Sequence, residues 1–438
     1  MGRKKQVRHG IPLKASALFL VITIVVTATI FKLVELTINN DHQALPKIEI
    51  SLSSVTIEEV DWRSKDLTYL DNIMTLSTKN SRLDFKDVEI KSRGNSTWGQ
   101  PKKPYQIKLQ TKVSLLGQSK SKKWILLANY LDRSHLRTDT AFYLENILGE
   151  NPLTGNFVEL YIDDTYRGLY YLTNKLEIGK QKINLKDEFG VIVELDNLHG
   201  SDSDEYAYTE DGNRISVYEA VNKDNAKTSL DIFISSFNEL VSAITEKNYD
   251  KVVSLADIDS FARYYLLSEF TNNPDAYSSS FFFFKDGIDD KIHVGPGWDF
   301  DYAFGNPLWT AEGVDENLVL SPSSSTVLKN YLTESGQNTS STYISSIASV
   351  VHNLLDFPEF EQKVRELYQA TLSKRSEELL AHIKDQASYI KNAALHDQSR
   401  WKLKTNFDEE VEYLIDWIEK RYDHLEEIYG VKSQNLTF

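Results

Sequence analysis

The sequence predicts an α+β, bilobal fold with a β-rich N-terminal lobe and a mostly helical C-terminal lobe, preceded by one N-terminal transmembrane segment. Three observations lead to this prediction. Up to about residue 200, short runs alternate between apolar and polar residues, as half-buried strands do. From about residue 228 the apolar residues recur at helical spacing. Near the N-terminus, residues 15–31 form an uncharged, mostly apolar run behind a basic segment.

We expect this apolar run to anchor the chain in a membrane as residues 15–36, behind a cytoplasmic basic segment of residues 1–14. A helix over residues 15–31 would rise about 26 Å, close to the thickness of a bilayer core. A cleaved signal peptide is the alternative, although the run lacks a convincing small-x-small cleavage site at its end. The basic segment keeps the N-terminus in the cytoplasm, so the body after a tether at residues 37–46 should lie outside the cell membrane of a single-pass protein.

Charge and composition exclude several classes of function. The formal net charge is −15, and the first 36 residues carry six Lys/Arg and one acid, which leaves −20 for the rest. A body this acidic is a poor nucleic-acid binder, because nucleic-acid binding depends on dense Lys and Arg. The chain has no cysteine, which excludes disulfides and thiolate metal sites and, in an exported chain, favours a bacterial surface protein. It also has no HExxH, Walker A, Gly-x-Ser-x-Gly or Gly-x-Gly-x-x-Gly motif.

The β-rich lobe is predicted over about residues 47–200. Alternating or apolar runs predict strands at 48–52, 88–92, 105–109, 124–128 and 190–196 and a hairpin at 158–172. Residues 94–104 contain Gly and Pro and predict a turn between two of these strands. One helix is expected to run from Arg137 to Leu148 and to stop at Gly149.

The helical lobe is predicted over about residues 228–430. Helices are expected at 230–244 and 258–270 and over most of the chain after residue 346. Phe281–Phe284 form an apolar run that indicates a strand buried on both faces. Residues 306–345 are rich in Ser, Thr and Asn and predict a surface insertion. No strong linker separates the halves, so residues 47–430 are expected to form one unit.

Basic residues of the β-rich lobe are candidates for binding phosphate. Lys108 stands on a strand and can pair with nucleotide phosphates while a helical carboxylate holds it, for which Glu145 is the natural candidate. The turn with Arg93 and Asn95 can offer a guanidinium and backbone N–H groups to phosphate oxygens. The alternatives are a solvated strand lysine and an ordinary hairpin turn.

Three aspartates of the second half complete a candidate site. Asp275 follows Asn-Pro directly after a helix, where a base in phosphoryl transfer accepts the proton of the attacking hydroxyl; an ordinary turn is the alternative. Asp299 and Asp301 end the next hairpin, and alternation along an extended segment would put both on one side, facing one Mg²⁺. With Lys108, these are the parts of a phosphoryl-transfer site, so kinase chemistry is the leading hypothesis.

The chain resembles the CotH (spore coat protein H) kinase family, a group of atypical, secretory-type protein kinases. The resemblance covers roughly residues 46–430 and is carried by an ordered set of stretches: RGNSTW with PKKPYQIKL, KKWILLANYLDRSHLRTDTAFYL, VELYIDDTYRGLYYL, GVIVELDN, NNPDAY and GWDFDYAFGN. It implies a protein-kinase-like bilobal fold and ATP with Mg²⁺ or Mn²⁺. It also implies phosphorylation of exported proteins, such as Ser residues of spore coat proteins.

The resemblance also assigns roles to single residues. Asp275 matches the loop aspartate of the family's Asn-x-Asp motif. Asp299 and Asp301 match the two acids of its Trp-Asp-x-Asp metal motif. Lys108 resembles the strand lysine that contacts the nucleotide.

Two positions depart from the family pattern. Ser280 stands where a metal-binding Asn is expected and would be a poorer ligand, and Asn174 follows Thr173 where the family often has Glu. The departures allow an altered metal preference, an altered nucleotide chemistry or a decayed site.

Taken with the N-terminal segment, the resemblance makes a membrane-anchored extracytoplasmic protein kinase the leading hypothesis. The alternatives are a non-catalytic surface or spore-coat assembly protein, and AMP transfer on the same scaffold.

Overall fold

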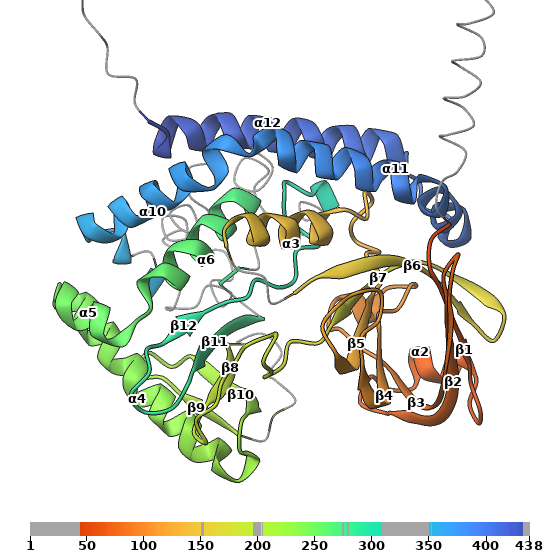
Figure 1. Ribbon diagram of the computed structural model, residues 1–438, viewed down its shortest axis with the longest axis horizontal. Coiled ribbons are helices and arrows are strands. Elements are labelled where there is room, and N and C mark those ends of the chain that lie inside the picture. Colours follow the sequence, from red (N-terminus) through yellow and green to blue (C-terminus); the bar gives the residue numbers. More distant parts are fainter. Residues whose placement is uncertain are drawn as a thin grey trace, which may run out of the picture. The chain divides into compact units, whose positions relative to one another are not determined.

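The computed structural model describes residues 44–149, 153–195, 203, 205–273, 276–277, 280–308, 350–351 and 353–431 (Figure 1). The chain divides into two compact units, Met1–Ala44 and Leu45–Phe438. The predicted anchor at residues 15–36 lies outside the described residues, and so does most of the predicted insertion. Within the ranges just given, no helix is both long and apolar enough to cross a membrane.

The first part of the second unit is a closed β-barrel, drawn in red to yellow in Figure 1. Its strands follow the order β1-β2-β3-β4-β5-β7-β6 around the barrel. Their bounds are β1 Lys47–Ser51, β2 Tyr69–Ser77, β3 Arg82–Ser92, β4 Tyr105–Val113, β5 Ser121–Leu127, β6 Gly155–Ile162 and β7 Thr165–Asn174. Neighbours are antiparallel except β1 and β6, which pair in parallel and close the barrel.

Alternation along these strands fills the barrel with apolar side chains. Ile48 and Ile50 of β1, Ile107 of β4 and Trp124 of β5 are fully or almost fully buried in one cluster. Because successive residues of a strand point to opposite faces, the polar residues between them lie outside the barrel. The short helix α2 (Ile57–Trp62) follows β1, and a 3-10 turn (Thr97–Gly99) lies between β3 and β4.

A second sheet has the strand order β12-β11-β8-β10-β9. Its strands are β8 Val191–Leu195, β9 Tyr206–Tyr208, β10 Arg214–Ala220, β11 Phe281–Lys285 and β12 His293–Val294. The prediction that the phenylalanine strand is buried on both faces is confirmed, because Phe281 and Phe283 belong to one apolar cluster and Phe282 to another. The β-rich region expected up to residue 200 divides after β7, since β8 pairs with β10 and β11 of this sheet.

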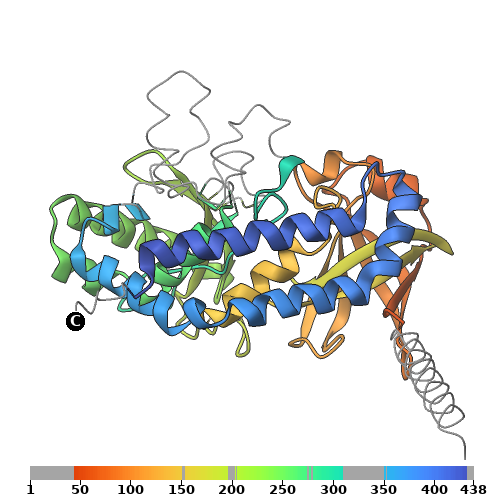
Figure 2. The same ribbon diagram turned by 90° about the horizontal axis from the view of Figure 1, so that it is seen from above.

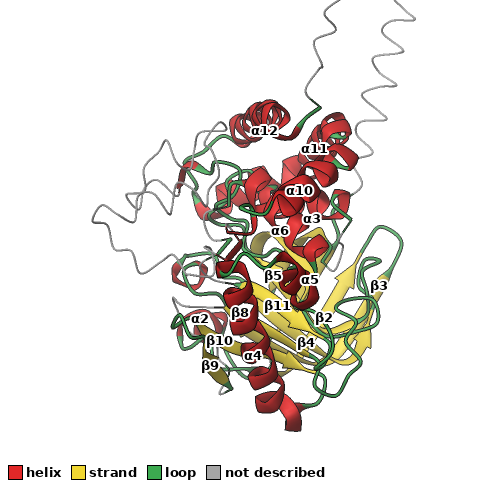
Figure 3. Ribbon diagram, turned by 90° about the vertical axis from the view of Figure 1, so that its left-hand side faces the viewer, coloured by secondary structure: helices red, strands yellow, loops and turns green. Residues whose placement is uncertain are grey.

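Most helices gather on one side of the strands, whereas α4 lies along the second sheet (Figure 3, helices red and strands yellow). They are α3 Arg137–Ile147, α4 Ala226–Thr245, α5 Tyr249–Leu255, α6 Ile258–Thr271, α10 Pro358–Ala370, α11 Ser376–Trp401 and α12 Phe407–Tyr429. The predicted helices are confirmed, and the fold is α+β. The long helices α11 and α12 run side by side across α3 and α6 (Figure 2).

Helix α11 is joined to the barrel by a buried ion pair. Lys102 Nζ lies 2.6 Å from Asp397 Oδ1, and neither side chain is exposed. The Asp397 carboxylate also accepts from Leu169 N at 2.8 Å. Gly168 permits this approach, because a Cβ there would lie 2.1 Å from Asp397 Oδ1, and its φ of +120° suits only glycine.

Candidate functional site

A direct hydrogen bond joins the loop after α6 to the predicted metal motif. Helix α6 ends at Thr271 and is capped by Asn272, whose left-handed φ of 45° is a conformation that Asn tolerates. The side chain of the next residue, Asn273, donates from Nδ2 to the carbonyl oxygen of Asp299 at 3.1 Å. The structure therefore brings the NNPDAY and GWDFDYAFGN stretches together. Asp275 lies outside the described residues, and its role as a base stays a prediction.

The backbone around Asp299 and Asp301 differs from the extended segment that alternation assumed. Asp299 has a left-handed φ of 56° and is exposed. Asp301 is half-buried and begins a turn over residues 301–305. The turn is bonded to the end of α6, because Phe304 N donates to Thr271 O at 2.6 Å. The argument that alternation aligns the two acids is therefore wrong, although the two remain close in sequence at one motif.

The chemistry of the two acids fits a metal that arrives with a nucleotide. Mg²⁺ in nucleotide sites takes one or two carboxylates, with phosphate oxygens and water at the other positions. Among the residues the structure describes, no group of three or more His, Cys, Asp or Glu side chains could hold a metal ion. Ser280 stands just before β11, half-buried and with a left-handed φ of 50°. Its hydroxyl is a hard oxygen donor, and its role as a ligand stays a prediction.

Lys108 and Glu145 do not form the expected pair. Lys108 Nζ lies 2.7 Å from Glu89 Oε1, its partner in the β3–β4 register, and the lysine side chain is 39 % exposed. This follows from β4 itself, whose apolar residues Ile107 and Leu109 point into the barrel, so that Lys108 points out. Glu145 on α3 is buried and accepts from Gly297 N at 2.9 Å. It therefore holds the backbone just before the metal motif.

Of the two residues predicted in the RGNSTW turn, Arg93 reaches the metal motif. Its guanidinium carbon lies 5.7 Å from the centroid of the Trp298 ring. Asn95 is exposed, and its Oδ1 accepts from Lys65 Nζ at 2.5 Å. The turn itself needs Gly94, which has a φ of +92° and whose Cβ would lie 2.2 Å from a side-chain oxygen of Thr97.

Sequence reasoning missed a basic cluster, which we define as Arg93, Lys123 and Lys175. Lys175 follows β7 directly, and its backbone N donates to Lys123 O at 3.3 Å. The Lys175 ammonium lies 4.4 Å from the centroid of the Tyr218 ring on β10. The pKa of Lys175 is lowered to about 8, first by burial and then by the positive charges of Lys123 and Arg93, against the raising effect of Glu219 and Glu194.

The cluster is a candidate anion site. Desolvation and the charges of Lys123 and Arg93 disfavour the charged form of Lys175, Glu219 and Glu194 offset part of this effect, and a bound anion would add to that offset. The strand register also puts Lys123 beside Lys108, so the predicted lysine borders the cluster without being its centre. In the sequence, Lys175 is one lysine after a strand and has no feature that predicts a site. The cluster forms only because β5 pairs with β7 and Lys175 contacts Tyr218 of β10.

The fold and the site thus define an α+β protein with a carboxylate motif beside a basic cluster. A model of the CotH kinase protein family matches residues 90–425, which confirms the resemblance carried by the ordered motifs. The chain belongs to this family. It is also similar to the crystal structure of the Helicobacter pylori proinflammatory kinase CtkA, at 10 % identity over 74 % of this chain and 92 % of that one, with a TM-score of 0.31. No curated protein matches the chain.

Proposed function

We propose that this chain is an atypical protein kinase that transfers the γ-phosphate of ATP to a Ser or Thr hydroxyl of an exported protein. Membership of the CotH kinase family supports the reaction class. The observation that carries the proposal for the site is the bond from Asn273 Nδ2 to Asp299 O. It connects the loop that contains Asp275 to the acids suited to a nucleotide-bound metal. The barrel and the helical part would be the two lobes of a protein-kinase-like fold.

In the proposed reaction the hydroxyl oxygen of the substrate forms a bond to the γ-phosphorus, and the bond from that phosphorus to the β–γ bridging oxygen breaks, releasing ADP. Asp275 would accept the hydroxyl proton. Asp299 and Asp301 would hold Mg²⁺ or Mn²⁺, which supplies charge neutralisation at the phosphates. The basic cluster of Arg93, Lys123 and Lys175 would bind phosphate oxygens from the other side.

The experiment is intact-protein mass spectrometry of the full-length chain after incubation with ATP and Mn²⁺ or Mg²⁺, beside Asp299→Ala and Asp275→Ala. Addition of one or more phosphate groups in the wild type, absent from both variants, is the expected result. Nucleotide binding, followed by thermal shift, should be lost in Asp299→Ala and kept in Asp275→Ala, because a base acts on the chemical step. Wild-type phosphorylation in Asp299→Ala would remove that residue from the site.

Ser280 favours a second candidate. A hydroxyl in place of the family's Asn is a weaker ligand, which suits a non-catalytic surface or spore-coat assembly protein. Absence of both nucleotide binding and mass gain would support that candidate, and a gain of AMP in place of phosphate would support adenylate transfer. We also propose that residues 15–36 anchor the chain in a bacterial membrane, with the catalytic part outside the cytoplasm.

A further inference from the structure

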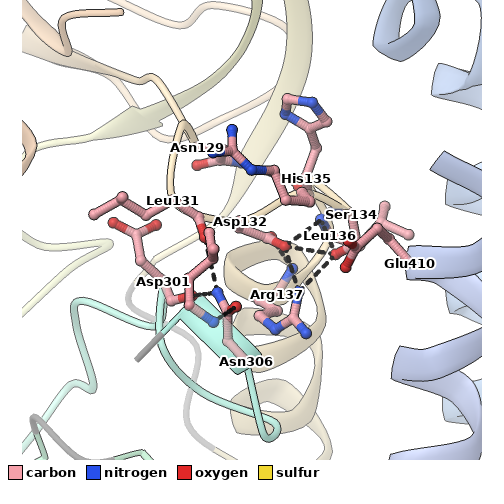
Figure 4. A network of polar contacts seen from close by, with 12 residues as sticks. Asn129, Leu131, Asp132, Ser134, His135, Leu136, Arg137, Asp301, Asn306 and Glu410 are labelled. Atoms are coloured by element: carbon pink, nitrogen blue, oxygen red, sulfur yellow. Dashed lines mark hydrogen bonds and ion pairs between the residues drawn. The ribbon is translucent and has the colours of Figure 1, made fainter. Parts of the chain in front are cut away.

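The turn that carries Asp301 is bound by a buried asparagine (Figure 4). Asn306 Nδ2 donates to Asp301 O at 2.7 Å and to Leu131 O at 2.8 Å. Asn306 is 1 % exposed, so both bonds form away from solvent. The residue lies at the start of the predicted surface insertion, but it is part of the core next to the metal motif. One side chain therefore joins the turn to the loop before α3.

An arginine at the start of α3 makes a second contact with the same turn. Arg137 Nε donates to Ala303 O at 2.9 Å. Its Nη1 lies 2.6 Å from Asp132 Oδ1, and neither side chain is exposed. The guanidinium of Arg137 thus pairs with the Asp132 carboxylate and also donates to the main chain of the turn. A planar guanidinium with fixed donors can serve both, whereas a lysine ammonium has no such fork.

Asp132 holds both the loop before α3 and the first residue of that helix. Its Oδ2 accepts from Arg137 N at 2.8 Å, and its Oδ1 accepts from Ser134 N at 3.0 Å and from Ser134 Oγ at 2.7 Å. The carboxylate therefore holds the backbone of its own loop as well as the arginine. Apart from Arg137 Nη2, which is buried without a hydrogen-bond partner among the described residues, the polar groups named here are bonded, and such a network favours one arrangement of the chain.

The turn needs such support because its backbone is strained. Phe304 has a φ of 53°, which non-glycine residues rarely adopt, and it is followed by Gly305 at 61°. Left-handed residues of this kind persist only where the surroundings fix them. Helix α12 adds one more bond, from Tyr413 OH to Gly305 O at 2.8 Å.

We propose that Asn306 and Arg137 are positioning residues for the metal motif. They bind main-chain oxygens of Asp301 and Ala303, fix the backbone of the turn, and so set the direction in which the Asp301 carboxylate meets the metal–nucleotide complex. The inference rests on the proposed function, in which Asp301 is a metal ligand. Neither Asn306 nor Arg137 needs to touch the nucleotide, and groups that act through a ligand in this way typically change metal affinity or activity by about 10- to 100-fold when removed.

The test uses Asn306→Ala and Arg137→Lys in the full-length chain. The matched control is Asn129→Gly, which removes another buried amide of the same loop. Asn129 Nδ2 donates to His135 O at 3.0 Å, within the loop, and glycine keeps its left-handed φ of 48°. The Mn²⁺ concentration for half-maximal ATP binding, kcat and the KM for ATP are measured for each variant, with Tm and amide hydrogen exchange of residues 301–305.

The expected result for Asn306→Ala is an increase of about tenfold or more in half-saturating Mn²⁺ and a matching fall in kcat. The control should lose a similar amount of Tm and keep the wild-type Mn²⁺ dependence. Hydrogen exchange of the turn should accelerate in Asn306→Ala and not in the control. Arg137→Lys should follow Asn306→Ala, because it keeps the charge for Asp132 and loses the donor to Ala303.

Two different results would separate this inference from the function on which it rests. If the wild type binds ATP with Mn²⁺ and Asn306→Ala does so at the same metal concentration, the positioning role is overturned and the kinase proposal stands. If the wild type neither binds ATP with metal nor transfers phosphate, the kinase proposal falls and the role of the turn in metal binding falls with it. Wild-type hydrogen exchange of residues 301–305 in both Asn306→Ala and Arg137→Lys would show that these residues do not fix the turn, whatever the catalytic result.

Discussion

Arg93 lies over the ring of Trp298, with 5.7 Å between the guanidinium carbon and the ring centroid. The contact joins the RGNSTW turn of the barrel to the residue just before Asp299. Because Arg93 also acts electrostatically on Lys175, it belongs both to the basic cluster and to the neighbourhood of the metal motif. The two most distinctive stretches of the sequence therefore meet at one cation and one aromatic ring.

Replacing this arginine should weaken nucleotide binding. We expect Arg93→Gln to lower the affinity for ATP with Mn²⁺ by about tenfold or more, since a hydrogen bond to a charged group contributes about 1.5–3 kcal/mol. Asn95→Ala is the control, because Asn95 is exposed and bonds Lys65. Isothermal titration calorimetry measures both. Wild-type affinity in both variants would show that the turn does not contact the nucleotide.

Nucleotide binding should depend on pH through Lys175. Burial and its basic neighbours lower the pKa of this lysine from 10.5 to about 8, so the ammonium loses its proton as pH rises through 8. A bound phosphate raises that pKa again, so binding near pH 8.5 should take up a proton and affinity should fall as pH increases from 7.5 to 9.5. Calorimetry in buffers of different ionisation enthalpy measures the uptake. Lys175→Met should abolish it, and uptake that persists in this variant would exclude the lysine.

Whereas nucleotide affinity should fall as pH rises, the contribution of Lys175 to the free energy of unfolding should rise. Because the folded pKa is depressed, the unfolded chain binds more protons between pH 8 and 10.5, and the free energy of unfolding gains from Lys175 as pH rises through this window. Below pH 8 the full penalty of burying the charge remains. Lys175→Met should therefore be more stable than the wild type at pH 7, with the difference shrinking towards pH 10. Urea unfolding at the two pH values tests this.

Arg421 on α12 should hold the end of α6 more strongly in alkaline than in acidic solution. Its Nε donates to Glu269 O at 3.0 Å, its Nη2 lies 3.6 Å from Glu269 Oε2, and both residues are buried. Burial raises the pKa of Glu269 to about 7, against the lowering effect of Arg421. With this folded pKa above the unfolded value of 4.5, the stabilising contribution of Glu269 protonation is complete below pH 4.5 and is lost as pH rises through 7.

Removing the arginine takes away the charge that lowers the pKa of Glu269, so above pH 7 the buried carboxyl must either stay charged without its partner or take up a proton. We expect Arg421→Met to lose about 3–5 kcal/mol at pH 8, the usual cost of breaking a buried pair, and clearly less at pH 5.5, where Glu269 is protonated. Chemical unfolding at both pH values makes the comparison. A loss that is the same at pH 5.5 and pH 8 would mean that packing, and not the carboxylate, dominates.

Gly168 should tolerate alanine much less well than Gly117. Both have positive φ, of +120° and +81°, but only at Gly168 would a Cβ meet neighbours, with Asp397 Oδ1 at 2.1 Å; nothing lies within 4 Å at Gly117. We expect Gly117→Ala to lose about 1–2 kcal/mol from backbone strain alone. Gly168→Ala should lose at least about 2 kcal/mol more, because the buried Lys102–Asp397 pair must move. Similar unfolding midpoints for the two variants would contradict this.

Restoring the family's residue at position 280 should strengthen metal binding. Ser280 has a φ of 50°, a left-handed conformation that asparagine adopts more readily than most residues. Ser280→Asn should therefore fold without loss of Tm and should lower the Mn²⁺ concentration needed for half-maximal ATP binding. Ser280→Ala is the control for removal of the hydroxyl. An Asn variant that binds Mn²⁺ no better than the wild type would remove position 280 from the metal site.

Much of the local structure could be predicted, because it depends on spacing within short segments. The alternation at 105–109, the apolar run Phe281–Phe284 and the helical spacing after residue 346 each predict the element that forms there. Barrel closure could not be predicted, since it depends on β1 pairing with β6 more than a hundred residues later. The membership of β8 in the second sheet is likewise a matter of long-range pairing.

The positions of some candidate residues could be predicted, while their roles stay predictions. The motifs indicated Arg93 and the Asp299–Asp301 segment; Arg93 lies over the Trp298 ring, and the loop after α6 bonds Asp299 O. The pairing of Lys108 with Glu145 was wrong, because the nearest acid for a strand lysine is the one across the ladder, Glu89. Asn306 and Arg137 lie within two of the stretches that carry the family resemblance, but no role could be predicted for either, since a residue that binds distant main-chain oxygens has no characteristic spacing.

The parallel pair between β1 and β6 has a consequence for how the chain acquires its structure during synthesis. Ile48 cannot meet its partner Leu160 until the ribosome has made everything between them. Until then, one edge of β1 presents unpaired N–H and C=O groups, which other strands can bind. A nascent or truncated chain that stops before β6 would therefore be a target for chaperones and a seed for aggregation. The first strand to emerge is completed by one of the last strands of the barrel.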